Sequence, residues 1–154
     1  MKKFILFLSA ILLSGFAFSQ DVKIVDNRYF NTDGTLFSGK YHEYYENGNL
    51  KMEKDIVSGK VEGSSIFYFE NGNKKEERHF RNGEKEGRWS TWDQNGTKTA
   101  EAGFKAGKKD GYWYIWNKAG TKLYEMYYVN GEKRGKWSIW DENGNLTSEQ
   151  DYGK

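Results

Sequence analysis

The chain has 154 residues, which is enough for one domain or one short array of repeats. It contains no cysteine, which excludes disulfides, thiolate chemistry and a lipid-modified cysteine anchor. Its 24 basic and 22 acidic residues create no single-sign field, so we expect no nucleic-acid partner and nothing favours membrane lipid.

The first 19 residues have the features of a secretory signal peptide. A basic tip, Met1-Lys2-Lys3, is followed by the apolar run from Phe4 to Leu13. This run is shorter than the ~20 apolar residues that span a bilayer, so an uncleaved anchor is the less favoured alternative. Small residues in Ala17-Phe18-Ser19 predict cleavage before Gln20 and export to the periplasm or the extracellular space.

Residues 20–38 are predicted to form an irregular N-terminal cap. Apolar residues such as Val22, Ile24 and Tyr29 alternate loosely with polar ones, and Asp33-Gly34 is a hairpin signal. Terminal units of repeat proteins are usually atypical, which fits this position.

From residue 39 onward the sequence repeats every 24 residues, and a fixed period in this range indicates a repeat architecture. The five units are residues 39–62, 63–86, 87–110, 111–134 and the truncated 135–154, called units 1 to 5 below. One glycine recurs at the start of each unit: Gly39, Gly63, Gly87, Gly111 and Gly135. One glutamate recurs equally faithfully: Glu53, Glu77, Glu101, Glu125 and Glu149.

Two kinds of turn divide each unit. Asn-Gly pairs such as Asn95-Gly96 predict type I′ hairpin turns, because both residues tolerate positive φ. Ala119-Gly120 departs from this pattern, so a weaker or different turn is expected there. The second turn lies at Ser58-Gly59 and its equivalents, and we expect a four-residue loop, Ala106 to Lys109 in unit 3.

The runs between turns are rich in aromatic and β-branched residues, which favour strands. The predicted fold class is all-β: a single-layer antiparallel meander of about ten strands, a β-hairpin repeat array behind the irregular cap. Ser90 is expected to pair with Glu101, and the units are expected to stack without net slip; a two-residue second turn would instead shear each unit by two positions. The expected pairs across the second turn place an apolar residue on each glycine: Ile56 opposite Gly63, Phe80 opposite Gly87, Phe104 opposite Gly111 and Tyr128 opposite Gly135.

Alternation of side chains along the strands separates two faces. Trp89, Trp113 and Trp137 are expected to share the core face with Ile115 and Ile139. A second aromatic column is expected on the opposite face, beside the glutamates: Tyr44, Tyr68, Trp92, Trp116 and Trp140.

The second aromatic column and the glutamate column are the candidate binding residues. The rings could stack on sugars or partner side chains, or they could only stabilise the sheet. The carboxylates could bind a cation or repeated ligand groups, or they could pair with neighbours such as Lys51, Lys75 and Thr99. Identical glutamates have identical environments, which argues against catalysis, and we predict no enzyme, no cofactor and no metal site.

The run from Asn130 to Gly144 carries a family likeness. Its pattern Asn-Gly-Glu-Lys-Arg-Gly-Lys-Trp-Ser-Ile-Trp-Asp-Glu-Asn-Gly resembles the variant MORN repeat (membrane occupation and recognition nexus). This variant is found in YwqK-type antitoxins and in exported bacterial repeat proteins, and the likeness covers residues 39–154. The resemblance implies a β-hairpin array used for binding.

These observations predict an exported, non-catalytic repeat protein that binds a protein or a glycan through an aromatic sheet face. The alternative is a YwqK-type antitoxin or immunity protein that binds a toxin, although a signal peptide does not suit a cytosolic toxin. A carbohydrate-active enzyme is a third hypothesis. Open sheet edges also permit an edge-to-edge homodimer.

Overall fold

The computed structural model describes residues 21–153, so the predicted signal peptide, residues 1–19, lies outside the described part of the chain. All regular secondary structure within residues 21–153 consists of β-strands. This part of the chain contains no helix long and apolar enough to cross a membrane.

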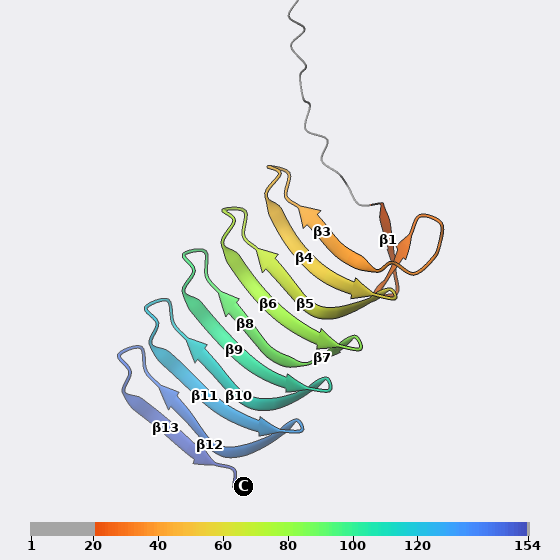
Figure 1. Cartoon of the computed structure of the whole chain (residues 1–154). Helices are drawn as coiled ribbons and strands as arrows, with labels where there is room; N and C mark the ends of the chain where they lie inside the picture. The colour runs from red at the N-terminus through yellow and green to blue at the C-terminus, as the bar shows by residue number, and fades with distance from the viewer. Residues whose placement is uncertain (1–20, 154) are drawn as a thin grey trace, which may run out of the picture.

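The repeats form one curved antiparallel sheet, in which each strand pairs with the next along the chain (Figure 1). Ten strands follow one meandering path, as predicted, and a short piece, β7, pairs with β6 beside that path. The strands are β3 (Gly39–Tyr44), β4 (Leu50–Val57), β5 (Lys60–Tyr68), β6 (Lys74–Arg81), β7 (Glu84–Lys85), β8 (Gly87–Trp92), β9 (Lys98–Lys105), β10 (Lys108–Trp116), β11 (Lys122–Val129), β12 (Glu132–Trp140) and β13 (Leu146–Asp151).

The cap is a small separate hairpin of β1 (Val22–Val25) and β2 (Arg28–Asn31). Its Tyr29, only 4% exposed, packs edge-on against Tyr41 of unit 1 with 5.1 Å between the ring centres. Ile56 completes this small core, and the Tyr29 amide donates to the Gly59 carbonyl at 3.0 Å. The cap therefore covers one face of the first unit.

The Asn-Gly loops are not the predicted type I′ turns. Gly96 has a φ of +86°, but Asn95 does not have positive φ. The Gly96 amide donates to the Asp93 carbonyl at 3.0 Å, and Asp93 Oδ1 accepts from the Asn95 amide. This is a type I turn closed by a left-handed glycine, a common longer hairpin loop. Because only glycine needs positive φ, Ala119-Gly120 forms the same turn, and the prediction of a weaker turn there was wrong.

The second turns are two-residue type I′ turns, and the predicted four-residue loop was wrong. Both central residues have positive φ, as at Asn82 (53°) and Gly83 (80°). Even Ala106 adopts a φ of 45°. Lys105 pairs directly with Lys108 across this turn.

A wide bulge follows each of these turns and cancels the shear that a two-residue turn would cause. In unit 3, Phe104 pairs with Lys109 but Ala102 pairs with Trp113, so three residues oppose the single Gly103. Gly111 occupies the bulge with a φ of +90°, which explains the glycine at the start of units 2 to 5. The units therefore stack without net slip, and Ser90 pairs with Glu101 as predicted.

The bulge corrects the predicted partners of the glycines. Phe104 does not pair with Gly111, nor Ile56 with Gly63. Each glycine instead faces the aromatic or aliphatic residue of its own unit, on the strand that follows the Asn-Gly loop. These pairs are Gly39 with Ile56, Gly63 with Phe80, Gly87 with Phe104 and Gly111 with Tyr128. At Gly135 the amide and carbonyl bond to Gly153 and Tyr152, rather than to Tyr128.

We call the face that carries Trp89, Trp113 and Trp137 face A. Its rings form one unbroken row in which neighbouring centres lie 4.8–5.6 Å apart: Phe80, Trp89, Phe104, Trp113, Tyr128, Trp137 and Tyr152. The indole N–H of Trp113 donates to the Gly103 carbonyl at 3.0 Å, and Trp89 and Trp137 make equivalent bonds. Ile115 and Ile139 remain 38% and 37% exposed. Face A is therefore the structural face, although its two isoleucines are not buried.

Lysine side chains cover the row of rings on face A. The amino groups of Lys85, Lys109 and Lys133 lie 4.3–5.0 Å from the centres of two rings each. Cation–π attraction of this kind stabilises the row and shields its apolar surface from water. With this cover, Tyr128 is only 7% exposed on a single-layer sheet.

Candidate functional site: face B

We call the opposite face, which carries the glutamate column, face B. The five predicted aromatic residues each end a strand at the Asn-Gly loop side of the sheet. They are Tyr44 in β3, Tyr68 in β5, Trp92 in β8, Trp116 in β10 and Trp140 in β12. A one-residue bulge at each of these ends, such as Trp92 opposite Lys98, places a lysine beside the ring in units 2 to 4.

These rings have few aromatic partners. The Trp116 ring lies 5.5 Å from Tyr114. Trp92 has the amino groups of Lys74 and Lys98 at 5.3 and 5.7 Å from its centre. It lines a hollow of about 280 Å³ together with Lys74, Asn73, Asn95 and Gly96. Tyr44 at the first strand is 52% exposed. Tyr44 is exposed and the other four rings are half-buried, and the column does not form one continuous row of rings as on face A.

Each glutamate of the column is held by a neighbouring polar group. Lys74, Lys98 and Lys122 pair with Glu77, Glu101 and Glu125 at 2.8, 2.7 and 2.5 Å. At the two ends, Glu53 accepts from the Tyr68 hydroxyl at 3.2 Å, and Glu149 pairs with Lys136 at 2.7 Å.

The predicted structural partners of the glutamates were wrong in identity. Lys51 pairs with Glu43, Lys75 lies over Phe69, and Thr99 shares a hydrogen bond with Thr91. In units 2 to 4 the bulge lies at the start of the strand that carries the glutamate. It turns the first lysine of that strand toward the carboxylate. Sequence reasoning missed the lysines of units 2 to 4, although Lys74, Lys98 and Lys122 recur at the repeat period.

A tyrosine cluster on face B was also missed. Tyr112 and Tyr114 of β10 stack with centres 5.6 Å apart and planes 10° apart. Tyr127 of β11 lies 4.8 Å from Tyr112. The signal in the sequence was the alternation of Tyr112, Tyr114 and Trp116, which places all three on one face.

The phenols near the carboxylates keep their protons at neutral pH. Burial and the Glu53 charge raise the pKa of Tyr68, and burial with the Glu125 charge raises the pKa of Tyr114. These hydroxyls can therefore donate or accept hydrogen bonds, but they are not anions.

The titratable groups of face B do not gather into a metal centre. Among residues 21–153, no group of three or more histidine, aspartate or glutamate side chains could hold a metal ion. His42 and His79 each lie near a glutamate of the column instead, at 3.8 and 3.6 Å. The arrangement offers stacking surfaces and paired donors and acceptors.

The fold and face B define a β-hairpin repeat array with one structural face and one open polar–aromatic face. The model of the MORN repeat variant matches residues 37–55, 61–82 and 133–153. The chain therefore carries MORN-variant repeats, and the resemblance seen in the sequence is confirmed at these segments. The hairpins of β8 to β11, between the matched segments, repeat the same register.

Two further comparisons add no functional information. No curated protein matches the chain. Among solved structures, it is similar to a chain of the Glycosylation Associate Protein (Gap123) complex from Streptococcus agalactiae, at 17% identity and a TM-score of 0.38. The similarity covers 68% of this chain and 19% of that one.

Proposed function

We propose that this chain is an exported, non-catalytic binding module that holds a protein or a glycan against face B. The observation that carries the proposal is the contrast between the faces. On face A the rings pack against one another under lysines. On face B the column rings stand at strand ends without forming such a row, and Trp92 lines a hollow with polar neighbours. Accessible aromatic rings with polar neighbours are typical of binding surfaces.

The glutamate column supports binding rather than catalysis. Glu77, Glu101 and Glu125 share one kind of partner, a lysine three residues earlier. General acid–base chemistry needs two carboxyl groups with different proton affinities. A series of equivalent ion pairs instead presents equivalent contacts at intervals of two strands, about 9.6 Å.

The test replaces Trp92, Trp116 and Trp140 together by alanine and measures capture of cell-envelope proteins and binding to a glycan array. We expect the captured ligand to be lost while the circular dichroism spectrum is retained. The control replaces Ile115 and Ile139, which are exposed on face A, and should retain the ligand. Loss in the control and retention in the triple variant would contradict the proposal.

Export belongs to the same proposal and has its own test. Mass spectrometry of the protein from the native cell should find a mature chain that begins at Gln20. All six residues of the edge strand β13 are exposed, so edge pairing is the form of homodimer we propose. The antitoxin alternative stays a prediction from the family resemblance.

A further inference from the structure

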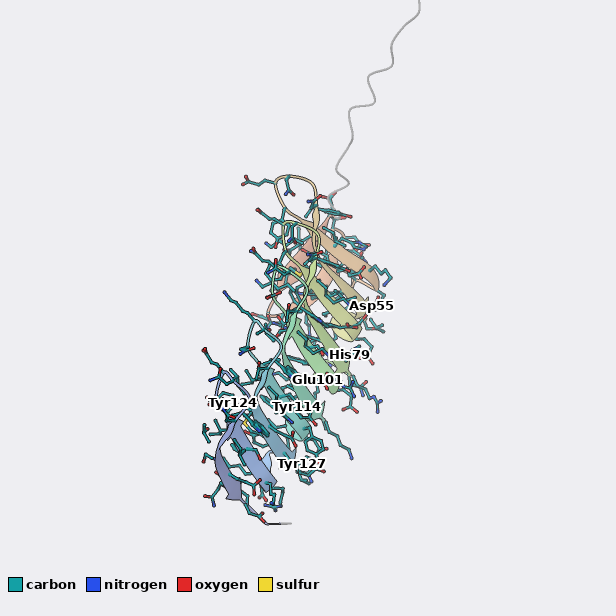
Figure 2. All side chains as sticks on the ribbon, turned by 90° about the vertical axis from the view of Figure 1, so that its left-hand side faces the viewer. Asp55, His79, Glu101, Tyr114, Tyr124 and Tyr127 are labelled. Atoms are coloured by element: carbon teal, nitrogen blue, oxygen red, sulfur yellow. The ribbon has the colours of Figure 1, made fainter. Side chains whose placement is uncertain are left out.

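One position of the repeat on face B varies between units, and a hollow lies beside the unit that has a glycine there. Equivalent positions in the five units hold Asp55, His79, Gly103, Tyr127 and Asp151. Figure 2 shows Asp55, His79 and Tyr127 along one side of the sheet, with Glu101 and Tyr114 between His79 and Tyr127. Gly103 is the only one of the five without a side chain, and a hollow lies beside it.

The hollow at Gly103 has a volume of about 450 Å³, within the range of ~300–1,000 Å³ for small-molecule sites. Its floor includes Gly87, Gly103 and Gly111, where a ligand can approach the backbone. The glycine at 103 is required for a local reason as well, because a Cβ there would lie 2.1 Å from the Asp110 carbonyl oxygen.

Aromatic rings form one wall of the hollow. Tyr112 is 51% exposed and stacks on Tyr114, and Tyr127 supports it from the next strand. Tyr112, held between Tyr114 and Tyr127, is a platform whose exposed surface can stack on the C–H face of a pyranose ring.

Polar groups on the other side offer both donors and acceptors. The Arg88 guanidinium lies 3.2 Å from a Glu101 oxygen, while the second Glu101 oxygen pairs with Lys98. Arg88 is 71% exposed and keeps free N–H groups. Adjacent hydroxyls of a sugar each donate and accept, so an arginine next to a carboxylate matches a pair of them.

The charges of this hollow favour a neutral ligand. Arg88 and Lys98 are balanced by Glu101 and Asp110, and the Asp110 carboxylate already accepts from the Asn130 amide at 2.9 Å. A phosphate or a nucleic acid would need a net positive site. A flat aromatic platform with few, balanced polar groups suits a neutral sugar.

We propose that the hollow bounded by Arg88, Glu101, Gly103, Tyr112 and Tyr114 is a subsite for one neutral pyranose residue of a glycan. This inference rests on the proposed binding function of face B. It specifies the ligand as a saccharide and places it at this hollow. The pyranose ring stacks on Tyr112, and its hydroxyls bond to Arg88 and Glu101.

The test titrates the full chain with neutral oligosaccharides of glucose, galactose, mannose and N-acetylglucosamine. Binding is followed by calorimetry and by the amide NMR signals of Gly87, Gly103 and Gly111. Tyr112→Lys introduces the residue found at the equivalent Lys40 and Lys136, so the fold is retained. It should weaken binding at least about fivefold, whereas Tyr112→Phe should stay within about twofold.

Tyr124→Lys, on face A, is the matched control and should bind as the unaltered chain does. If an oligosaccharide binds and is lost in the Trp92, Trp116 and Trp140 triple variant but not in Tyr112→Lys, the subsite is wrong and the face B proposal stands. If none of the oligosaccharides binds, or the glycine signals do not move, the saccharide proposal is overturned. Capture of a protein by face B would then support only the broader function.

Discussion

Glycine serves two different physical purposes within unit 3. Gly111 has a φ of +90° and open space where a Cβ would be, so its requirement lies in the backbone conformation. Gly103 has no positive φ, but a Cβ there would lie 2.1 Å from the Asp110 carbonyl oxygen. Gly111 is required by its positive φ, and Gly103 by the close approach of the Asp110 carbonyl.

Substitutions separate these two requirements. Gly111→Ala should lower the free energy of unfolding by about 1–2 kcal/mol, and Gly111→Asn should lower it less because asparagine tolerates the left-handed region. Gly103→Ala should cost a similar ~1–3 kcal/mol by overpacking, with no recovery in Gly103→Asn. Urea denaturation of the four variants measures both effects. Equal recovery by asparagine at the two positions would show that the distinction is wrong.

Tyr41 gives the fold a dependence on alkaline pH. Burial, with help from the Glu43 carboxylate, raises the pKa of Tyr41 to about 12. The unfolded tyrosine titrates near pH 10, so the folded state holds its proton more tightly. This stability is complete below about pH 10 and is lost as pH rises through about 12.

We expect Tyr41→Phe to remove the most alkaline step of the ultraviolet tyrosinate titration. The variant should also lose less stability than the unaltered chain between pH 10 and 12. An unchanged titration curve would mean that Tyr41 does not carry this shift.

At the scale of the elements, the two turns of each unit make different demands on the residue before glycine. Ala106 has a φ of 45°, whereas Ala119, also before a glycine, does not have positive φ. An alanine in the left-handed region is strained, and asparagine is better suited to it.

Ala106→Asn should therefore raise the free energy of unfolding by about 0.5–1 kcal/mol. Ala119→Asn is the matched control, with the same sequence change in a turn of the other type, and should have little effect. Thermal denaturation measures the stability of both variants. If only Ala119→Asn is stabilised, the turn types assigned to the two positions are wrong.

Much of the architecture could be predicted because the same pattern of turns and strands recurs in every unit. The meander, the pairing of Ser90 with Glu101 and the division of aromatic columns between faces followed from turn spacing and alternation. The turn types could not be predicted, because Asn-Gly is compatible with both. The wide bulge at Gly111 adds residues to one strand only, and no local signal distinguishes it from a longer loop.

The candidate site was predicted only in part. The positions of Trp92 and Glu101 on one face followed from alternation, but the lysines that hold the carboxylates depend on the bulge at Lys98. The hollow lies beside Gly103, the one glycine in its column. A glycine among many glycines gave no reason to single it out before the register was known.

At the scale of the whole molecule, the units stack without slip, so one complete 24-residue unit can be removed without changing the register of the others. Deleting residues 87–110 joins two units whose strands are already in register, so we expect a shorter sheet that unfolds cooperatively at lower denaturant concentration. Deleting residues 87–109 leaves one extra residue and exchanges the two faces beyond the junction. Circular dichroism and denaturation should show a folded protein only for the first deletion. Equal folding of both would contradict the register.

The proposed function of the whole molecule depends on one face stabilising the sheet while the other is free to bind. Trp113 and Trp116 lie on the same strand and on opposite faces. Trp113 contacts Phe104, Tyr128, Lys109 and the Gly103 carbonyl, whereas the ring contact of Trp116 is with Tyr114. The most direct measurement is the free energy of unfolding of Trp113→Ala beside that of Trp116→Ala. We predict a loss of more than about 2 kcal/mol for the first and less than about 1 kcal/mol for the second, and equal or reversed losses would contradict the account.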